Sequence, residues 1–184
     1  PLQSGDDEVL TRMNRKHTTD DYRRIIRSIR QILPEATIFT DIIVGFTGET
    51  NEQFENTRLA MQEFRFNMAY IAKYSPRPGA ASSRWEDDVP GDIKNKRLHV
   101  LTSELTRHTL YNNKGLIGTR IRVLVTGKSR KQGYLSAVTE GKILLRFQSD
   151  DASLIGEFAE VIIESATEFS LGAKLIKKIT EEKV

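Results

Sequence analysis

The spacing of apolar residues changes once along the chain, near Gly115. Before that point apolar positions recur every three to four residues, as in amphipathic helices, and short apolar runs separate these segments. From Thr119 onward apolar and polar residues alternate in stretches bounded by glycines, which is typical of short strands. The alternating positions are Ile121, Val123 and Val125, then Ile143, Leu145 and Phe147, then Phe158, Val161 and Ile163. The change predicts two domains, residues 1–114 of α/β structure and residues 115–184 as a small OB-like β-barrel.

One short apolar run organises the first domain. Residues 40–44 (Thr-Asp-Ile-Ile-Val) predict a strand buried on both faces, as in a parallel sheet, and two glycines turn the chain after it. Thr50 and Gln53 then match a capping box, which predicts a helix over about 51–64. In α/β folds the turn between such a strand and helix is where ligands bind, although the same unit also serves packing alone.

Further elements are predicted on both sides of this strand. A short helix over 6–14 and a helix from 18 or 19 to 33 precede it, and a strand over 67–74 and a helix over 90–113 follow it. The helix ending at 33 has apolar residues at helical spacing, namely Tyr22, Ile25, Ile26, Ile29, Ile32 and Leu33. The strand over 67–74 alternates loosely around Met68, Tyr70 and Ala72. Residues 1–5 predict the end of a strand, so we expect a fragment of a longer protein.

Composition narrows the possible chemistry. With 184 residues, of which 38% are hydrophobic and 29% charged, the chain is typical of a globular protein with its own core. A net charge of +3 permits a nucleic-acid partner without requiring one. Cysteine is absent, which excludes disulfides, cysteine nucleophiles and thiolate-held clusters within this chain. The three histidines lack partners at metal-ligand spacing, so the sequence predicts no metal site.

An arginine lies in a rigid loop after the strand over 67–74. Residues 75–79 read Ser-Pro-Arg-Pro-Gly, and the two prolines restrict the backbone on both sides of Arg77. A cation held at the carboxyl end of a strand is well placed to bind an anion. A surface turn with an incidental arginine is the alternative.

Basic residues gather early in the predicted barrel. Between residues 119 and 137 there is no acidic residue, and the candidate phosphate-binding side chains are Arg120, Arg122, Lys128, Ser129, Arg130 and Lys131. The pattern favours contact with RNA, whereas a solvated hairpin turn is the alternative.

Several of these motifs together resemble the radical-SAM methylthiotransferases. The matching segments are residues 2–5 (Leu-Gln-Ser-Gly), 12–15 (Arg-Met-Asn-Arg), 40–46 with 48–50, and 74–79 (Tyr-Ser-Pro-Arg-Pro-Gly). The terminal barrel resembles the TRAM domain of that family, at residues 154–156 and 170–171. The sequence departs from the family at Thr47, where proline is usual, at Ala80, where threonine is usual, and at residues 137–139, which lack the arginine of Gly-Arg-Thr.

The resemblance implies a fold and a set of cofactors. The fold is the C-terminal part of a partial (β/α) radical-SAM barrel of TIM-like type, followed by an all-β TRAM barrel. S-adenosylmethionine is the implied cofactor, together with two [4Fe–4S] clusters whose cysteines lie outside this chain. The chain alone is therefore expected to be inactive. By the same resemblance, the residues at the barrel mouth that bind S-adenosylmethionine are Gln3, Ser4, Asp41, Gly45, Phe46, Tyr74, Ser75 and Arg77.

The implied activity is a tRNA modification. S-adenosylmethionine is cleaved reductively to a radical, and a methylthio group is added to the adenosine 3′ of the tRNA anticodon, at position 37. The TRAM domain would bind the tRNA, and the implied protein is a cytoplasmic monomer without a membrane partner. Two alternatives stay open: a methylthiotransferase acting on a ribosomal protein, and a non-catalytic RNA-binding module.

Overall fold

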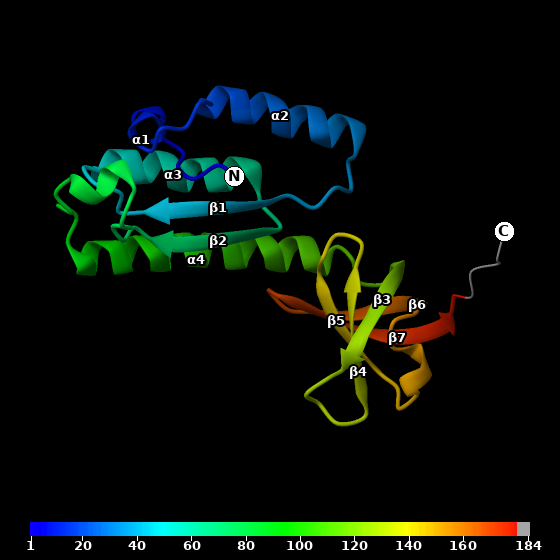
Figure 1. Cartoon of the computed structure of the whole chain (residues 1–184). Helices are drawn as coiled ribbons and strands as arrows, with labels where there is room; N and C mark the ends of the chain where they lie inside the picture. The colour runs from blue at the N-terminus through cyan, green and yellow to red at the C-terminus, as the bar shows by residue number, and fades with distance from the viewer. Residues whose placement is uncertain (180–184) are drawn as a thin grey trace. The chain divides into compact units, whose positions relative to one another are not determined.

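The structure, a computed structural model, describes residues 1–179 and divides into two compact units, the first from Pro1 to His108 and the second beginning at Thr109 (Figure 1). The first unit contains α1 (Asp7–Arg12), α2 (Thr19–Ile32), β1 (Phe39–Val44), α3 (Asn51–Phe64), β2 (Met68–Lys73), the 3₁₀ helix η1 (Ala81–Arg84) and most of α4 (Gly91–Lys114). The second contains β3 (Arg120–Lys128), β4 (Tyr134–Thr139), β5 (Leu144–Gln148), the 3₁₀ helix η2 (Ala152–Leu154), β6 (Phe158–Ala166) and β7 (Ser170–Lys178). Residues 180–184 of the predicted second domain lie outside the described residues.

The first unit is built on a short parallel sheet. β1 and β2 pair in parallel along their whole length, from Phe39 opposite Met68 to Val44 opposite Lys73. Gln3 adds a parallel bridge to Ile42, and its backbone N–H donates to the Asp41 carbonyl at 2.9 Å. Residues 2–4 therefore act as a third neighbour in the sheet. The α/β class predicted from the sequence is confirmed for this unit.

Helices α2, α3 and α4 share one core with the sheet, whereas Val9 of α1 packs with Phe46 and Tyr74, near Ile43 on the cavity side. The shared core contains Leu2, Ile26, Ile38, Ile42, Val44, Ala60, Met61, Phe64, Phe66, Ala69, Leu101 and Leu105, drawn from α2, α3, α4 and the sheet. On β1 the side chains of Thr40, Ile42 and Val44 are buried, whereas Asp41 is exposed. The prediction that this strand is buried on both faces is wrong, because its other face borders a cavity.

Two further patterns of burial differ from the sequence expectation. On β2, Ala69 is buried while Tyr70 is 66% exposed, so the alternation around Tyr70 marks the cavity side of the strand. On α2 only Ile26 is fully buried, whereas Ile25 and Ile32 are 54% and 76% exposed. The helix contacts the core along one narrow stripe, and its remaining aliphatic side chains fall outside that stripe.

Capping residues set the starts of two helices where the sequence predicts them. Thr50 and Gln53 form the expected capping box at α3, and Thr18 and Asp21 form a second one at α2. Each box satisfies backbone N–H groups that have no partner within the helix. The bounds of α2 and α3 therefore follow from short local signals.

The capping box of α2 makes stability depend on acid pH. The Thr18 backbone N–H and hydroxyl, with Arg24, lower the pKa of the Asp21 carboxyl from 3.8 to about 2. A lowered folded-state pKa contributes stability that is present above 3.8 and lost as the pH falls through about 2. We expect the stability difference between wild type and Asp21→Asn, measured by urea unfolding, to shrink across this window. A difference that stays constant from pH 5 to pH 2 would contradict this assignment.

The second unit is a closed barrel with strand order β3-β4-β5-β7-β6. Four pairings are antiparallel, and β5 pairs with β7 in parallel. Its core contains Val123, Val125, Leu135, Ala137, Leu145, Phe147, Leu154, Ala159, Val161, Ile163, Leu171 and Ala173. The predicted β-barrel is confirmed, and β4 and β7 complete the three strands that alternation had indicated. Among residues 1–179, no helix is long and apolar enough to cross a membrane.

Candidate functional site

The free face of the parallel sheet borders a cavity of about 670 Å³. Its walls come from β1, β2 and Gln3, from the loops that follow residues 44 and 73, and from residues 12–15 at the end of α1. Six of the eight barrel-mouth residues predicted from the sequence line it: Gln3, Asp41, Phe46, Tyr74, Ser75 and Arg77. This is where (β/α) barrels place their ligands.

The other two predicted residues, Ser4 and Gly45, lie behind the cavity wall. Ser4 is fully buried, and its hydroxyl lies 3.2 Å from the hydroxyl of Thr57 on α3. Gly45 is buried with a φ of 69°, a backbone conformation that favours glycine. Both residues shape the segments on which lining residues are carried, and neither is a lining residue itself.

Three aromatic side chains form one part of the cavity wall. The rings of Phe46 and Tyr74 meet edge to face with centroids 4.7 Å apart, and the centroid of the Trp85 ring lies 6.0 Å from that of Phe46. The Tyr74 hydroxyl donates to the Ser82 carbonyl at 3.1 Å, which ties the strand end to η1. The cluster offers an apolar surface to a planar group.

Polar and charged groups complete the lining. Asp41 and Arg77 are both exposed and border the same cavity, so it presents a carboxylate and a guanidinium. Sequence reasoning did not assign Asn14 and Arg15, which also line it. Both residues belong to the Arg-Met-Asn-Arg segment, which the sequence analysis matched to a family motif. In the structure Asn14 follows α1 with a left-handed φ of 55°. Gln3 is likewise left-handed, at 68°, and such strain gathers at ligand-binding sites.

A buried ion pair supports the turn that carries Phe46. Glu49 is 4% exposed; its carboxylate accepts from the Gly45 backbone N–H at 2.6 Å and from Arg97 Nη1 at 2.7 Å. Arg97 also donates to the Glu49 carbonyl at 3.1 Å and to Asn51 at 2.9 Å. Burial raises the pKa of Glu49, while the Gly45 N–H and the Arg97 charge lower it in part. The turn is thereby attached to α4.

A buried lysine connects α4 to the segment that follows β2. Lys94 is 5% exposed and donates to the Tyr74 carbonyl at 3.3 Å and to the Asp87 carboxylate. Its aliphatic chain runs so close to Gly45 that a Cβ there would lie 2.4 Å from Lys94 Cγ. Lys94 and Arg97 together fix the strand ends that carry the aromatic cluster.

The barrel places the predicted RNA-binding residues at two separate positions. Arg120 and Arg122 lie at the start of β3, whereas Lys128 ends that strand and Lys131 lies in the loop before β4. Six residues of extended strand between 122 and 128 correspond to about 20 Å. Arg122 stacks over Phe158 at 3.9 Å, and Lys131 lies over Tyr134 at 3.8 Å. The basic residues therefore do not form one cluster.

Comparison with known families assigns both units. Residues 1–60 match the Radical SAM superfamily, and residues 114–176 match the TRAM domain. The barrel of β3 to β7 is thus similar to TRAM domains, and the matched residues 1–60 include β1, which borders the cavity.

The similar proteins that align with nearly the whole chain share one name. The proteins named tRNA-2-methylthio-N(6)-dimethylallyladenosine synthase from Oceanobacillus iheyensis, Cellvibrio japonicus and Pseudomonas syringae are 40%, 37% and 37% identical to the chain. The alignments cover 98%, 96% and 96% of the chain but only 35%, 39% and 40% of those proteins. The resemblance to radical-SAM methylthiotransferases is confirmed, for a chain that spans well under half the length of these relatives.

The cofactors that this family implies can be compared with the residues present. Radical SAM proteins use S-adenosylmethionine and iron–sulfur chemistry. The first unit fits the first of these, since its cavity combines an aromatic wall with a carboxylate and a guanidinium. It does not fit the second, because the chain contains no cysteine to supply a thiolate.

Proposed function

We propose that the chain is part of an enzyme that adds a methylthio group to the adenosine 3′ of the tRNA anticodon. In this proposal residues 1–114 belong to the catalytic barrel and bind S-adenosylmethionine, and residues 115–184 form the TRAM domain and bind the tRNA. The observation that carries it is the convergence of six predicted residues, from Gln3, β1 and the loops after β1 and β2, on one cavity. The names of the relatives support the tRNA substrate over a ribosomal protein.

Each group at the cavity would have a defined part in binding the cofactor. The aromatic wall of Phe46, Tyr74 and Trp85 would hold a planar base and exclude water. Asp41 suits the ammonium or ribose hydroxyls, and Arg77 suits a carboxylate or a phosphate through two parallel hydrogen bonds. When bound, S-adenosylmethionine supplies the radical chemistry that activates a carbon–hydrogen bond. The residues of this chain orient the reactants and contribute no catalytic side chain of their own.

The remaining parts of the proposal concern the whole protein. Two [4Fe–4S] clusters would be held by cysteines outside this chain, since the chain has none. The chain by itself would then be inactive. We also expect a monomer in the cytoplasm, where tRNA is modified.

Arg77 provides the most direct test of this function. In the full-length gene product, with its clusters reconstituted anaerobically, Arg77→Ala should lower methylthiolation of tRNA at least tenfold and weaken S-adenosylmethionine binding. Thermal stability should change little, because Arg77 is exposed in a loop. Arg77→Lys should restore activity only in part, since a lysine lacks the planar two-pronged donor. Turnover and cofactor affinity would be measured in parallel.

Arg84 offers a matched control for that experiment. It is an exposed arginine in η1, seven residues away, and it does not line the cavity. Arg84→Ala should leave turnover and cofactor binding at wild-type levels. If Arg77→Ala behaves in the same way, Arg77 is a structural turn residue and the proposed cofactor site is wrong.

A further inference from the structure

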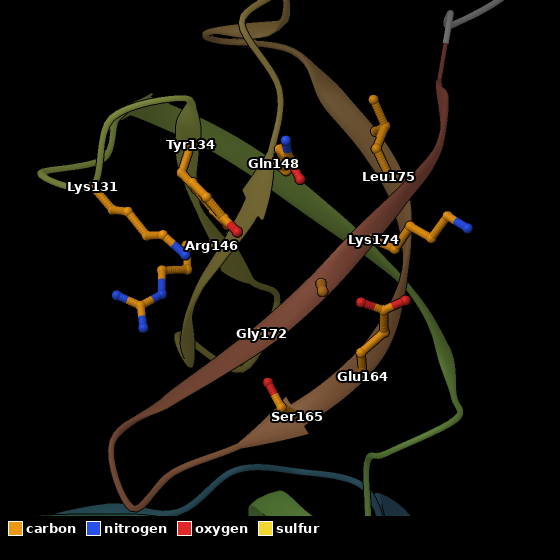
Figure 2. Close-up of a pocket in the computed structure, with 10 residues that line it drawn as sticks. Lys131, Tyr134, Arg146, Gln148, Glu164, Ser165, Gly172, Lys174 and Leu175 are labelled. Atoms are coloured by element: carbon orange, nitrogen blue, oxygen red, sulfur yellow. The ribbon is translucent and has the colours of Figure 1, made fainter.

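A second cavity, of about 520 Å³, lies on the outer wall of the TRAM barrel (Figure 2). Its centre follows from the pairing of three strands: Arg146 on β5 lies opposite Gly172 on β7, which lies opposite Ser165 on β6. None of the six RNA-binding residues predicted from the sequence borders it except Lys131. The parallel pairing of β5 with β7 brings these distant segments together.

A glycine, Gly172, lies at the floor of this cavity opposite Ser165 of β6. A Cβ on Gly172 would lie 2.2 Å from the Ser165 hydroxyl oxygen but 3.6 Å from Ser165 Cβ, so the hydroxyl reaches over the glycine and would have to turn aside for a larger residue. The pairing of β6 and β7 also shifts between Ile163 and Ser165, and both Glu164 and Ser165 are exposed as a result. Gly172 thus leaves one residue of backbone without a side chain at the bottom of the hollow.

Unpaired cations surround the hollow. Lys131, Arg146 and Lys174 line it, with Glu164 as the one carboxylate, and within residues 1–179 none of the three cations has an ion pair. By contrast, the next lysines along β7 are paired: Lys177 with Glu160 at 3.6 Å and Lys178 with Glu157 at 3.4 Å. The cavity therefore carries a net positive charge that suits phosphate.

Two groups in the cavity suit a nucleobase. Tyr134 and Gln148 face each other across β4 and β5, and the Tyr134 hydroxyl points into the hollow (Figure 2). The Tyr134 ring carries Lys131 Nζ 3.8 Å from its centroid, which holds a cation beside an aromatic surface. The Gln148 amide can both donate and accept, as recognition of a base edge requires.

We propose that this cavity binds one unpaired nucleotide of the RNA substrate, with its phosphate toward Arg146 and Lys131 and its base beside Tyr134 and Gln148. The inference rests on the proposed function, because it assumes that the TRAM domain meets tRNA. The volume lies within the range of small-ligand sites, and a double helix would need a broad, shallow surface instead. Single-stranded segments are the part of an RNA whose bases are free to enter such a hollow.

The experiment compares single-stranded and duplex RNA on the intact 184-residue chain. Affinities for a labelled seven-nucleotide RNA, for the same sequence as a duplex and for tRNA would be measured at several salt concentrations. Tyr134→Ala should weaken single-strand binding by roughly 5- to 150-fold, the range for loss of one base-stacking aromatic. Arg146→Ala should lower the slope of log affinity against log salt by about 0.7, as expected for one phosphate contact to a single strand. Duplex binding should change little in either variant.

Lys177→Ala is the matched control, because it removes one positive charge from the same barrel at a paired site. Tyr134→Phe and Arg146→Gln remove the hydroxyl or the charge with little change in size, and circular dichroism would check the fold of each variant.

If wild type binds RNA but the Tyr134 and Arg146 variants match Lys177→Ala, the cavity proposal is overturned and the loop at 128–131 remains the RNA site. If wild type binds neither the single strand nor tRNA, the proposed role of the TRAM domain itself fails. Binding of a polyglutamate peptide in place of RNA, lost in the same variants, would overturn the proposal in favour of an acidic protein partner.

Discussion

Replacing Glu49 with alanine is expected to destabilise the first unit by about 3 to 5 kcal/mol, the usual cost of leaving one member of a buried ion pair without its partner. Arg97 would keep its charge in a site where it is 5% exposed, and the Gly45 backbone N–H would lose its acceptor. Urea unfolding followed by Trp85 fluorescence measures this directly. Trp85 is the single tryptophan of the chain. Its ring centroid lies 6.0 Å from that of Phe46, and Phe46 is part of the turn that Glu49 supports.

A surface ion pair of the same residue types serves as the comparison. Glu63 on α3 accepts from Arg23 Nη2 at 2.9 Å, but both side chains are partly exposed. Glu63→Ala should cost about 0 to 1 kcal/mol, as exposed pairs do. Replacing Glu49 and Arg97 together with leucine should recover much of the loss, because no buried charge is then left unpaired. Equal losses in the free energy of unfolding for Glu49→Ala and Glu63→Ala would show that the buried pair stabilises the unit no more than the exposed pair does.

Gly45→Ala is the second change with a large expected effect. Alanine at a φ of 69° costs roughly 1 to 2 kcal/mol in backbone strain. Its Cβ would also lie 2.4 Å from Lys94 Cγ, and Lys94 cannot move aside easily because it is buried and hydrogen-bonded to Tyr74. Such overpacking typically costs a further 1 to 3 kcal/mol. The free energy of unfolding would again be followed through Trp85.

Substitution of Gly48 separates the cost of backbone strain from the cost of overpacking against Lys94. The φ of 74° at Gly48 is nearly the same, yet the nearest atom to an added Cβ is the Arg12 guanidinium carbon at 3.8 Å. Gly48→Ala should therefore show the backbone strain without the clash, and Gly45→Ala should be the more destabilising by about 1 to 3 kcal/mol. Similar losses at the two glycines would mean that Lys94 relaxes and that the turn is not tightly packed against α4.

Local signals in the sequence were sufficient for the elements themselves. The capping box at Thr50 and Gln53 predicted the start of α3, and alternation bounded by glycines predicted three of the five barrel strands. Such signals work because helix caps and strand periodicity depend on residues a few positions apart. They failed at β1, where an unbroken apolar run was interpreted as burial on both faces. An apolar run shows that a strand is mostly buried, but it does not show which neighbours cover each side.

The sites depended far more on tertiary structure. The sequence by itself determined that Arg77 lies between two prolines after a predicted strand and that the chain resembles a known family. Only the fold showed that Asn14 and Arg15 border the same cavity as Arg77, and that Arg122 and Lys128 lie at opposite parts of β3. The hollow at Gly172 depends on the pairing of β7 with both β5 and β6. The paired residues Arg146 and Gly172 are 26 positions apart in the sequence. Strand pairing between distant segments decides which side chains share a surface, and no local pattern of apolar and polar residues records it.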